Sequence, residues 1–205
     1  ILKKMKIEEE ADAVPGGRYH NHKDFMDFPE IGKKHHYYQK LPPVRHKDLP
    51  LHTSILKVLR KKDVMLHYPY QMFLHFIDLL REAAIDPQVE EIGITLYRVA
   101  ADSKVVNALM NAVRNGKMVT VVIELQARFD EEANIFWSNK LQEEGAHVIN
   151  GIPGLKIHSK LAWVERNEKN GIRNYAYVGT GNFHVGTARV YGDKGLLTAD
   201  PRIAN

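Results

Sequence analysis

The residues most able to do chemistry lie in one short run at positions 155–161. Polar and apolar side chains alternate there, so a strand would place Lys156, His158 and Lys160 on one face. Two ammonium groups beside an imidazole oppose its protonation and keep its lone pair available for attack on phosphorus. The lysines would also stabilise charge on the phosphoryl oxygens. The run indicates either a phosphoryl-transfer nucleophile or a strand whose exposed face is merely basic.

A glycine-rich turn, Gly179-Thr180-Gly181-Asn182, begins 21 residues after His158. Glycines after a strand let backbone N–H groups approach a phosphate, and the Asn182 side chain can donate a further hydrogen bond. Ordinary turns use the same residue types, so the turn alone is a weak signal. Together with the upstream His-x-Lys it favours a phosphate site.

Two arginines follow consecutive predicted strands. Arg98 comes directly after the strand expected at 92–97, and Arg128 follows the strand expected at 119–125. In open α/β sheets, ligands bind beyond the carboxyl ends of the strands. The repeated position therefore suggests that both guanidinium groups converge on one crevice and hold phosphate or carboxylate. The alternative is a pair of ordinary surface arginines.

Hydrophobic periodicity supplies the elements that would position these residues. The expected order is a helix at 72–84, a strand at 92–97, a helix capped by Asp102 or Ser103, a strand at 119–125, a helix from 130 ended by Gly145, a strand at 146–149, and strand-like runs at 156–165 and 174–178. This alternation predicts an α/β domain with a mostly parallel or mixed sheet flanked by helices.

The first fifty residues differ from the rest of the chain. They are rich in proline turns and poor in apolar periodicity, and six of the eleven histidines fall by position 52. The histidine spacing fits no tight metal-ligand set. We expect residues 1–50 to be the end of an upstream domain plus a linker, and residues 51–205 to form the domain that carries the site, with a truncated end.

Composition excludes several classes of protein. Of 205 residues, 44% are hydrophobic and 26% charged, as in globular proteins. With no cysteine, disulfides, thiolate catalysis and cysteine-ligated zinc are excluded, and a cytoplasmic location is expected. The net charge of +4 permits an anionic ligand without requiring nucleic acid, and none is expected as a partner. The start at Ile1 suggests a piece of a longer protein.

His158-x-Lys160 with Gly179-x-Gly181-Asn182 resembles one half of the catalytic motif of the phospholipase D superfamily. Here Glu165 stands where that motif usually has Asp. Members of the superfamily use two such motifs, with one histidine as nucleophile and the other as general acid. This chain contains one of them.

A wider resemblance is to bacterial polyphosphate kinases of the ATP-dependent, autophosphorylating type. It extends over essentially the whole chain, through separated motifs at 19–25, 67–70, 96–100, 124–134, 154–160 and 179–191. It implies that residues 1–50 end the family's middle region and that 51–205 form the first of two phospholipase D-like C-terminal domains.

The resemblance implies a role for each site residue. His158 would be the phosphohistidine that takes the γ-phosphoryl group of ATP and passes it reversibly to polyphosphate, with Lys160 and Asn182 as phosphate contacts. Arg98 and Arg128 match the family's magnesium–phosphate site. An arginine is a poor metal ligand, so we expect these two to hold the phosphate oxygens that Mg²⁺ bridges.

Tyr191 matches a tyrosine at the family's ATP site. ATP, ADP and polyphosphate are the expected partners, with a homo-oligomer and peripheral membrane association as further expectations for the full-length enzyme. Two other functions stay open at this point: a phosphodiesterase or nuclease of the phospholipase D type completed by dimerisation, and a non-catalytic polyanion-binding domain. The 205 residues alone are expected to be inactive.

Overall fold

The chain folds into two compact units, Ile1–Lys40 and Leu41–Asn205. A computed structural model describes residues 4, 6, 16, 21–22, 25, 28–39, 41–100, 102–124, 131–152 and 154–205. Within the first unit the described residues include a short 3-10 helix, η3 (Lys34–His36). The second unit begins before residue 50, and Leu49 is already buried in its core.

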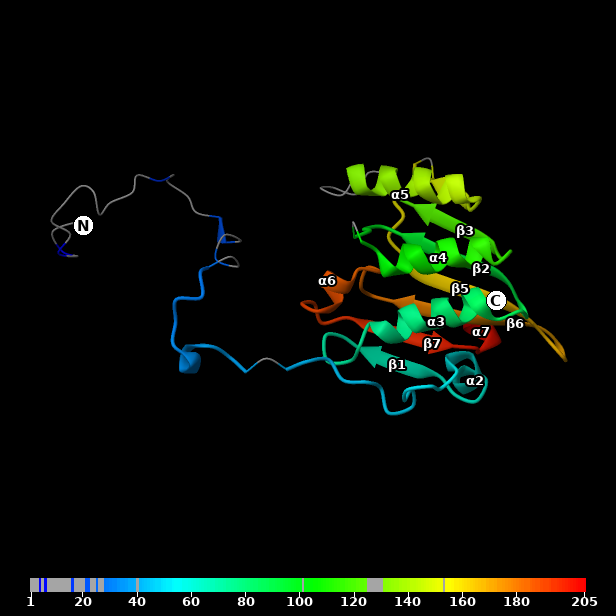
Figure 1. Ribbon diagram of the computed structural model, residues 1–205, viewed down its shortest axis with the longest axis horizontal. Helices are drawn as coiled ribbons and strands as arrows, with labels where there is room; N and C mark the ends of the chain where they lie inside the picture. Colours follow the sequence, from blue (N-terminus) through cyan, green and yellow to red (C-terminus); the bar gives the residue numbers. More distant parts are fainter. Residues whose placement is uncertain are drawn as a thin grey trace. The chain divides into compact units, whose positions relative to one another are not determined.

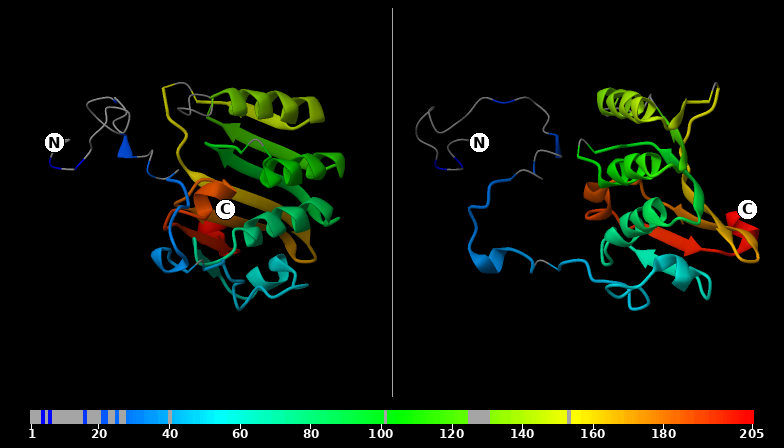
Figure 2. Two further views of the ribbon diagram at one scale, coloured as in Figure 1. Left: turned by 60° about the vertical axis from the view of Figure 1, so that its left-hand side comes forward. Right: turned by 45° about the vertical axis from the view of Figure 1, so that its right-hand side comes forward.

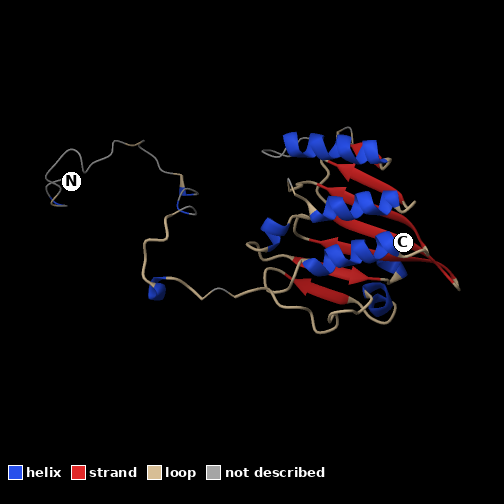
Figure 3. Ribbon diagram, in the orientation of Figure 1, coloured by secondary structure: helices blue, strands red, loops and turns tan. Residues whose placement is uncertain are grey.

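The second unit is built on one seven-stranded sheet (Figures 1 and 3). Its strands are β1 (Val64–His67), β2 (Val89–Leu96), β3 (Met118–Ile123), β4 (His147–Asn150), β5 (Lys160–Glu168), β6 (Gly171–Gly179) and β7 (Lys194–Thr198), in the spatial order β1-β7-β6-β5-β2-β3-β4. The expected α/β fold with a mixed, helix-flanked sheet is confirmed.

Parallel pairing is confined to β2, β3 and β4, and the other neighbours in the sheet are antiparallel. The expectation that most of the sheet would be parallel is therefore wrong. The reason is local for one pair: a two-residue turn at 169–170 joins β5 to β6, and so short a turn can only connect antiparallel strands. β1 and β7, which the periodicity did not reveal, add a further antiparallel pair, with Val64 opposite Leu197.

The helices of this unit are α2 (Ile55–Leu59), α3 (Leu74–Ile85), α4 (Lys104–Arg114), α5 (Glu131–Glu144), α6 (Val185–Ala188) and α7 (Pro201–Ala204). Figure 2 shows α3, α4 and α5 side by side along one face of the sheet. Ser103 caps α4 by accepting a hydrogen bond from the Val106 N–H at 3.3 Å, as expected. Gly145, with φ of 100°, follows α5 at the predicted end.

The core lies between this face and these helices. Alternate residues of β2, including Ile92 and Ile94, point toward the helices and are fully buried, and their register partners Val119 and Val121 on β3 share that face. Burying each such side chain stabilises the fold by about 1.5–3 kcal/mol.

Among the described helices, none is long and apolar enough to cross a membrane.

Candidate active site

One edge of the sheet brings the two sequence motifs together. β2 and β3 end at this edge, while β5 begins there and β6 returns to it (Figure 1). Lys160, the first residue of β5, lies directly opposite Gly179, the last residue of β6. The antiparallel pairing thus places the His-x-Lys run beside the glycine-rich turn, although 21 residues separate His158 from Gly179.

The run before β5 is not a strand, contrary to the expectation from its alternating pattern. Residues 156–159 have no regular secondary structure because buried side chains, rather than a neighbouring strand, bind their backbone. The Ile157 N–H donates to Glu124 Oε2 at 3.0 Å. The Ser159 carbonyl accepts a hydrogen bond from Thr95 Oγ1 at 2.7 Å, and Thr95 Oγ1 in turn accepts one from the Leu161 N–H at 3.1 Å.

The run nevertheless gathers its three polar side chains around one aromatic ring, that of Tyr97. The His158 imidazole packs edge-on against this ring with centroids 5.2 Å apart. Lys156 Nζ lies 5.5 Å and Lys160 Nζ 5.4 Å from the ring centroid, distances at which a cation is attracted to the ring. His158 and Lys156 are exposed, whereas Lys160 is buried.

These charges favour the neutral imidazole. The Lys160 ammonium, then partial burial and then the Lys156 charge hold the pKa of His158 below its ordinary value. Burial likewise lowers the pKa of Lys160, against the opposing charge of Asp193. Lys160 Nζ donates to the His158 carbonyl at 2.5 Å, which fixes the lysine against the backbone of the histidine. The arrangement leaves an exposed imidazole with an available lone pair.

The glycine-rich turn packs against Asp193. Thr180 Oγ1 donates to Asp193 Oδ1 at 2.7 Å, and a Cβ at position 181 would lie 2.4 Å from Asp193 Oδ2. A larger residue at 181 would therefore displace the Asp193 side chain, and glycine permits the close approach. The Asn182 Oδ1 atom is buried and has no hydrogen-bond partner within the described part of the chain.

The other predicted site residues lie at different places. Arg98 is half-buried two residues beyond the end of β2, at the same sheet edge as His158. Tyr191 lies between α6 and β7 with 62% of its surface exposed. Arg128 falls outside the described residues, so the convergence of the two arginines stays a prediction. Glu165 points to the opposite face of β5 from Lys160 and lies about 16 Å further along the strand.

Asn134 holds the site together, and sequence reasoning did not assign it a role. Its side chain is completely buried on α5, and its Nδ2 donates to the carbonyls of Tyr97 at 2.9 Å and Glu124 at 2.8 Å. The amide therefore ties α5 to the segments that follow β2 and β3. The sequence signal for Asn134 was its place in the 124–134 motif. The sequence signal for the Tyr97 ring was the position of Tyr97 directly after β2.

Among the described residues, no group of three or more His, Asp or Glu side chains is arranged to hold a metal ion. Mg²⁺ usually binds through one or two carboxylates together with substrate phosphates, so its presence at the site stays a prediction. Arg98 can only donate hydrogen bonds, so it would act on phosphate oxygens rather than on the ion.

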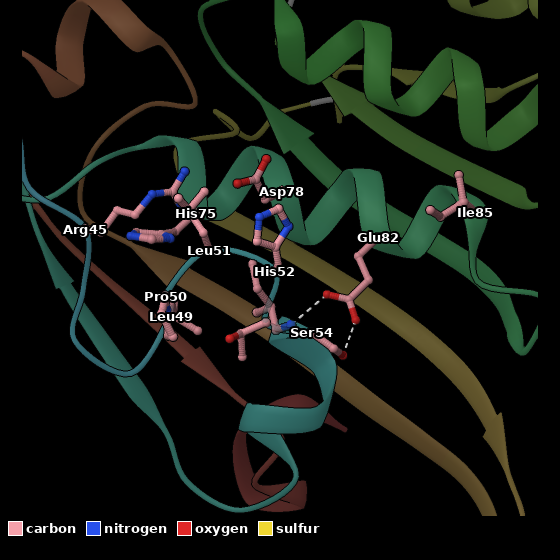
Figure 4. Close-up of a pocket in the computed structure, with 12 residues that line it drawn as sticks. Arg45, Leu49, Pro50, Leu51, His52, Ser54, His75, Asp78, Glu82 and Ile85 are labelled. Atoms are coloured by element: carbon pink, nitrogen blue, oxygen red, sulfur yellow. Dashed lines mark hydrogen bonds between the residues drawn. The ribbon is translucent and has the colours of Figure 1, made fainter.

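A separate cavity of about 390 Å³ lies between the start of α2 and α3 (Figure 4). Arg45 and Asp78 line it, together with Glu82. The Glu82 carboxylate accepts hydrogen bonds from the Ser54 hydroxyl and from the Ile55 N–H, the latter at 2.7 Å. Glu82 thus satisfies backbone and side-chain donors at the start of α2, and its role here is structural.

Comparison with known proteins agrees with this geometry. The family described as "Polyphosphate kinase C-terminal domain 1" matches residues 54–205. The chain belongs to the polyphosphate kinase family. The polyphosphate kinase of Vibrio vulnificus is 51% identical over 98% of this chain, and that of Escherichia coli is 50% identical over 100%. The chain spans 29% and 30% of the lengths of these two relatives.

Solved structures agree with the family and the fold. The crystal structure of polyphosphate kinase from Porphyromonas gingivalis matches 98% of this chain and 33% of its own, with 35% identity and a TM-score of 0.74. A phospholipase D family member, Nuc from Salmonella typhimurium, matches 70% of this chain and 86% of its own with 19% identity and a TM-score of 0.53. The latter likeness shows the fold alone.

Proposed function

We propose that this chain supplies the phosphorylated histidine of an enzyme that transfers phosphoryl groups between ATP and inorganic polyphosphate. In the first step a ring nitrogen of His158 attacks the γ-phosphorus of ATP, a P–N bond forms, and the bond to the departing ADP oxygen breaks. In the second step a terminal oxygen of polyphosphate attacks the same phosphorus and the P–N bond breaks. The reverse sequence regenerates ATP.

The observation that carries this proposal is the arrangement of His158, Lys156 and Lys160 around the Tyr97 ring. A neutral, exposed imidazole is a competent nucleophile, and the two nearby ammonium groups stabilise the negative charge of the approaching phosphate. Family membership supports the same reading, because relatives that match this chain are named polyphosphate kinases.

The remaining contacts are proposed on the family resemblance. Asn182, in the turn opposite Lys160, would hold the transferred phosphoryl group. Arg98 and Arg128 would hold phosphate oxygens that Mg²⁺ also binds, and the ion would arrive with the nucleotide. Tyr191 is exposed, which leaves its ring able to pack against an adenine base.

The test is to incubate the intact protein that carries this chain with γ-labelled ATP. We expect an acid-labile, alkali-stable label that disappears in His158→Ala and persists in the matched control His147→Ala, which removes an exposed histidine on β4. A label that survives His158→Ala would contradict the assignment of the nucleophile.

The same experiment separates the two alternatives. Release of nucleotide fragments from a phosphodiester substrate, without labelled protein, would favour the phosphodiesterase reading that the phospholipase D-like fold permits. Polyphosphate binding that is unchanged by His158→Ala, with no label at any time, would favour a non-catalytic polyanion-binding domain.

A further inference from the structure

A second concentration of positive charge lies at the opposite end of β5 from the candidate active site. Glu168 is the last residue of β5, eight residues after Lys160 and therefore about 26 Å further along the strand. It is buried, at the base of the hairpin that joins β5 to β6. In Figure 1 this hairpin lies at the other end of the sheet from α6.

Three arginines converge on this one carboxylate. Glu168 Oε1 accepts hydrogen bonds from the Tyr175 hydroxyl at 2.5 Å and from Arg166 at 3.1 Å. Glu168 Oε2 lies 3.1 Å from a terminal nitrogen of Arg60 and 3.4 Å from Nε of Arg173. The arginines come from the end of α2, from β5 and from β6, so only the folded chain assembles the cluster.

The carboxylate does not satisfy all of these cations. Arg166 is also neutralised by Asp86, at 2.9 Å. Arg60 and Arg173 share a single oxygen of Glu168, although each guanidinium has five N–H donors. Their side chains are 46% and 42% exposed, so part of each donor fork faces solvent. Glu168 thus holds Arg60 and Arg173 in fixed positions and leaves several of their N–H groups available to a ligand.

A cavity of about 370 Å³ opens at this cluster. The positively charged side chains that line it are Lys57, Arg60, Arg166, Lys169 and Arg173. Glu168 is the acidic residue in the same lining. With Asp86, which pairs with Arg166 from outside the lining, five positive charges face two negative ones. This excess makes the cavity, which we call the arginine pocket, attractive to a polyanion.

We infer that the arginine pocket binds a stretch of a phosphate polyanion at a distance from the reacting end of the chain. Arginine forks match the spacing of phosphate oxygens, and exposed lysines at the rim suit a ligand that continues out of the pocket. That the polyanion is inorganic polyphosphate rests on the proposed function. Binding in the arginine pocket would tether a long polyphosphate molecule and leave His158 free to act on the end of that polyphosphate.

The test measures equilibrium binding of polyphosphate and, separately, of ATP to the intact protein in a His158→Ala background, where no transfer occurs. Arg60→Ala/Arg173→Ala is expected to raise the Kd for polyphosphate at least about tenfold, because two forked contacts are lost. The Kd for ATP should not change. The matched control is Arg81→Ala/Arg202→Ala, which removes two exposed arginines outside the pocket and should change either Kd less than about twofold.

Arg60→Lys/Arg173→Lys keeps the charge, removes the forks and preserves a partner for Glu168, so it carries the test if the alanine variant unfolds. It should bind polyphosphate more weakly than the parent. An unchanged Kd for polyphosphate in this variant, an equal loss in the control pair, or a loss confined to ATP would each overturn the inference.

Failure of the proposed function gives a different result. With His158 intact, the arginine variants should still form the labelled phosphohistidine. Absence of label in the parent protein would count against phosphoryl transfer, whereas the comparison of Kd values judges the arginine pocket by itself.

Discussion

The chemistry of His158 depends on charges that neighbouring residues place beside it. Lys160 has the largest effect on the pKa of His158, but it is buried and hydrogen-bonded to the histidine's own backbone, so replacing it would disturb the fold. Lys156 acts in the same direction from an exposed position. It is therefore the residue through which the electrostatic effect can be tested without moving the site.

We predict that Lys156→Gln raises the pKa of His158. The neutral nucleophile is then lost at a higher pH, so the acid limb of the pH–rate profile for His158 phosphorylation shifts upward. Single-turnover labelling from pH 5 to 8 measures this, with the exposed Lys61→Gln as control. A profile that does not move in Lys156→Gln would show that the lysine charge does not act on the imidazole.

His75 provides a pH effect on stability rather than on catalysis. Burial, and after it the Arg45 charge, lower the pKa of His75 to about 4 against the opposing charge of Asp78. Its Nε2 accepts a hydrogen bond from the His46 N–H at 2.9 Å, which protonation would break. Below pH 6.5, His75 is protonated in the unfolded chain, whereas in the folded chain it stays neutral down to about pH 4. The free energy of unfolding therefore falls as the pH falls from 6.5 to about 4.

We therefore predict that the free energy of unfolding decreases between pH 6.5 and 4, with His75 responsible for at most about 3 kcal/mol. His75→Gln keeps an acceptor and removes the titration, so it should flatten the dependence. Urea unfolding at several pH values measures the slope, and His147→Gln, at an exposed position, should leave it unchanged. Equal slopes in His75→Gln and the parent would contradict the prediction.

At the scale of elements, α5 matters because it fixes the segments after β2 and β3. Asn134 reaches from this helix to the carbonyls of Tyr97 and Glu124, and Glu124 in turn holds the Ile157 N–H beside His158. A single buried amide thus connects a helix to two strand ends and, through Glu124, to the loop that carries His158.

We predict that Asn134→Ala lowers the free energy of unfolding by about 2 kcal/mol, because the Glu124 carbonyl loses a buried hydrogen bond and the Tyr97 carbonyl a part-buried one. Phosphohistidine formation should fall with it as Tyr97 loses its anchor. Asn134→Asp keeps the shape but lacks donors, so it should be at least as damaging. Chemical denaturation measures the free energy of unfolding of both Asn134 variants, with Asn111→Ala, at an exposed position on α4, as the control. A tolerated aspartate would show that shape rather than donation matters.

At the scale of the molecule, two concentrations of basic side chains lie at opposite ends of one sheet. One concentration surrounds His158 and the other is the arginine pocket. The antiparallel strands β5 and β6 run from one to the other, so the sheet fixes the separation between the proposed site of phosphoryl transfer and the proposed polyphosphate pocket.

We predict that the 205 residues produced alone show less than about 1% of the chain growth of the intact protein, because this chain offers one His-x-Lys motif and the resemblance implies that a second histidine supplies the acid. Polyphosphate synthesis per mole of protein measures this. Near-native synthesis by the isolated chain would mean that it contains every catalytic group.

Local patterns in the sequence predicted much of this protein. Apolar periodicity located α3, α4, α5, β2 and β3 to within a few residues, because the repeat of buried positions depends only on neighbours along the chain. Residue type and spacing also singled out His158, Lys160 and the glycine-rich turn as the proposed site, since a nucleophile, a cation and close backbone N–H groups are what phosphoryl transfer requires.

Only the tertiary structure decided what those segments meet. Pairing between strands far apart in the sequence, such as β2 with β5 and β1 with β7, made the sheet mixed, and no local pattern specifies it. The ring of Tyr97 became the centre of the site because a buried Asn134 holds the backbone after β2. The arginine pocket arises in the same way: residues far apart in sequence converge on Glu168 because burying a carboxylate requires charged and hydrogen-bonding partners, whichever elements supply them.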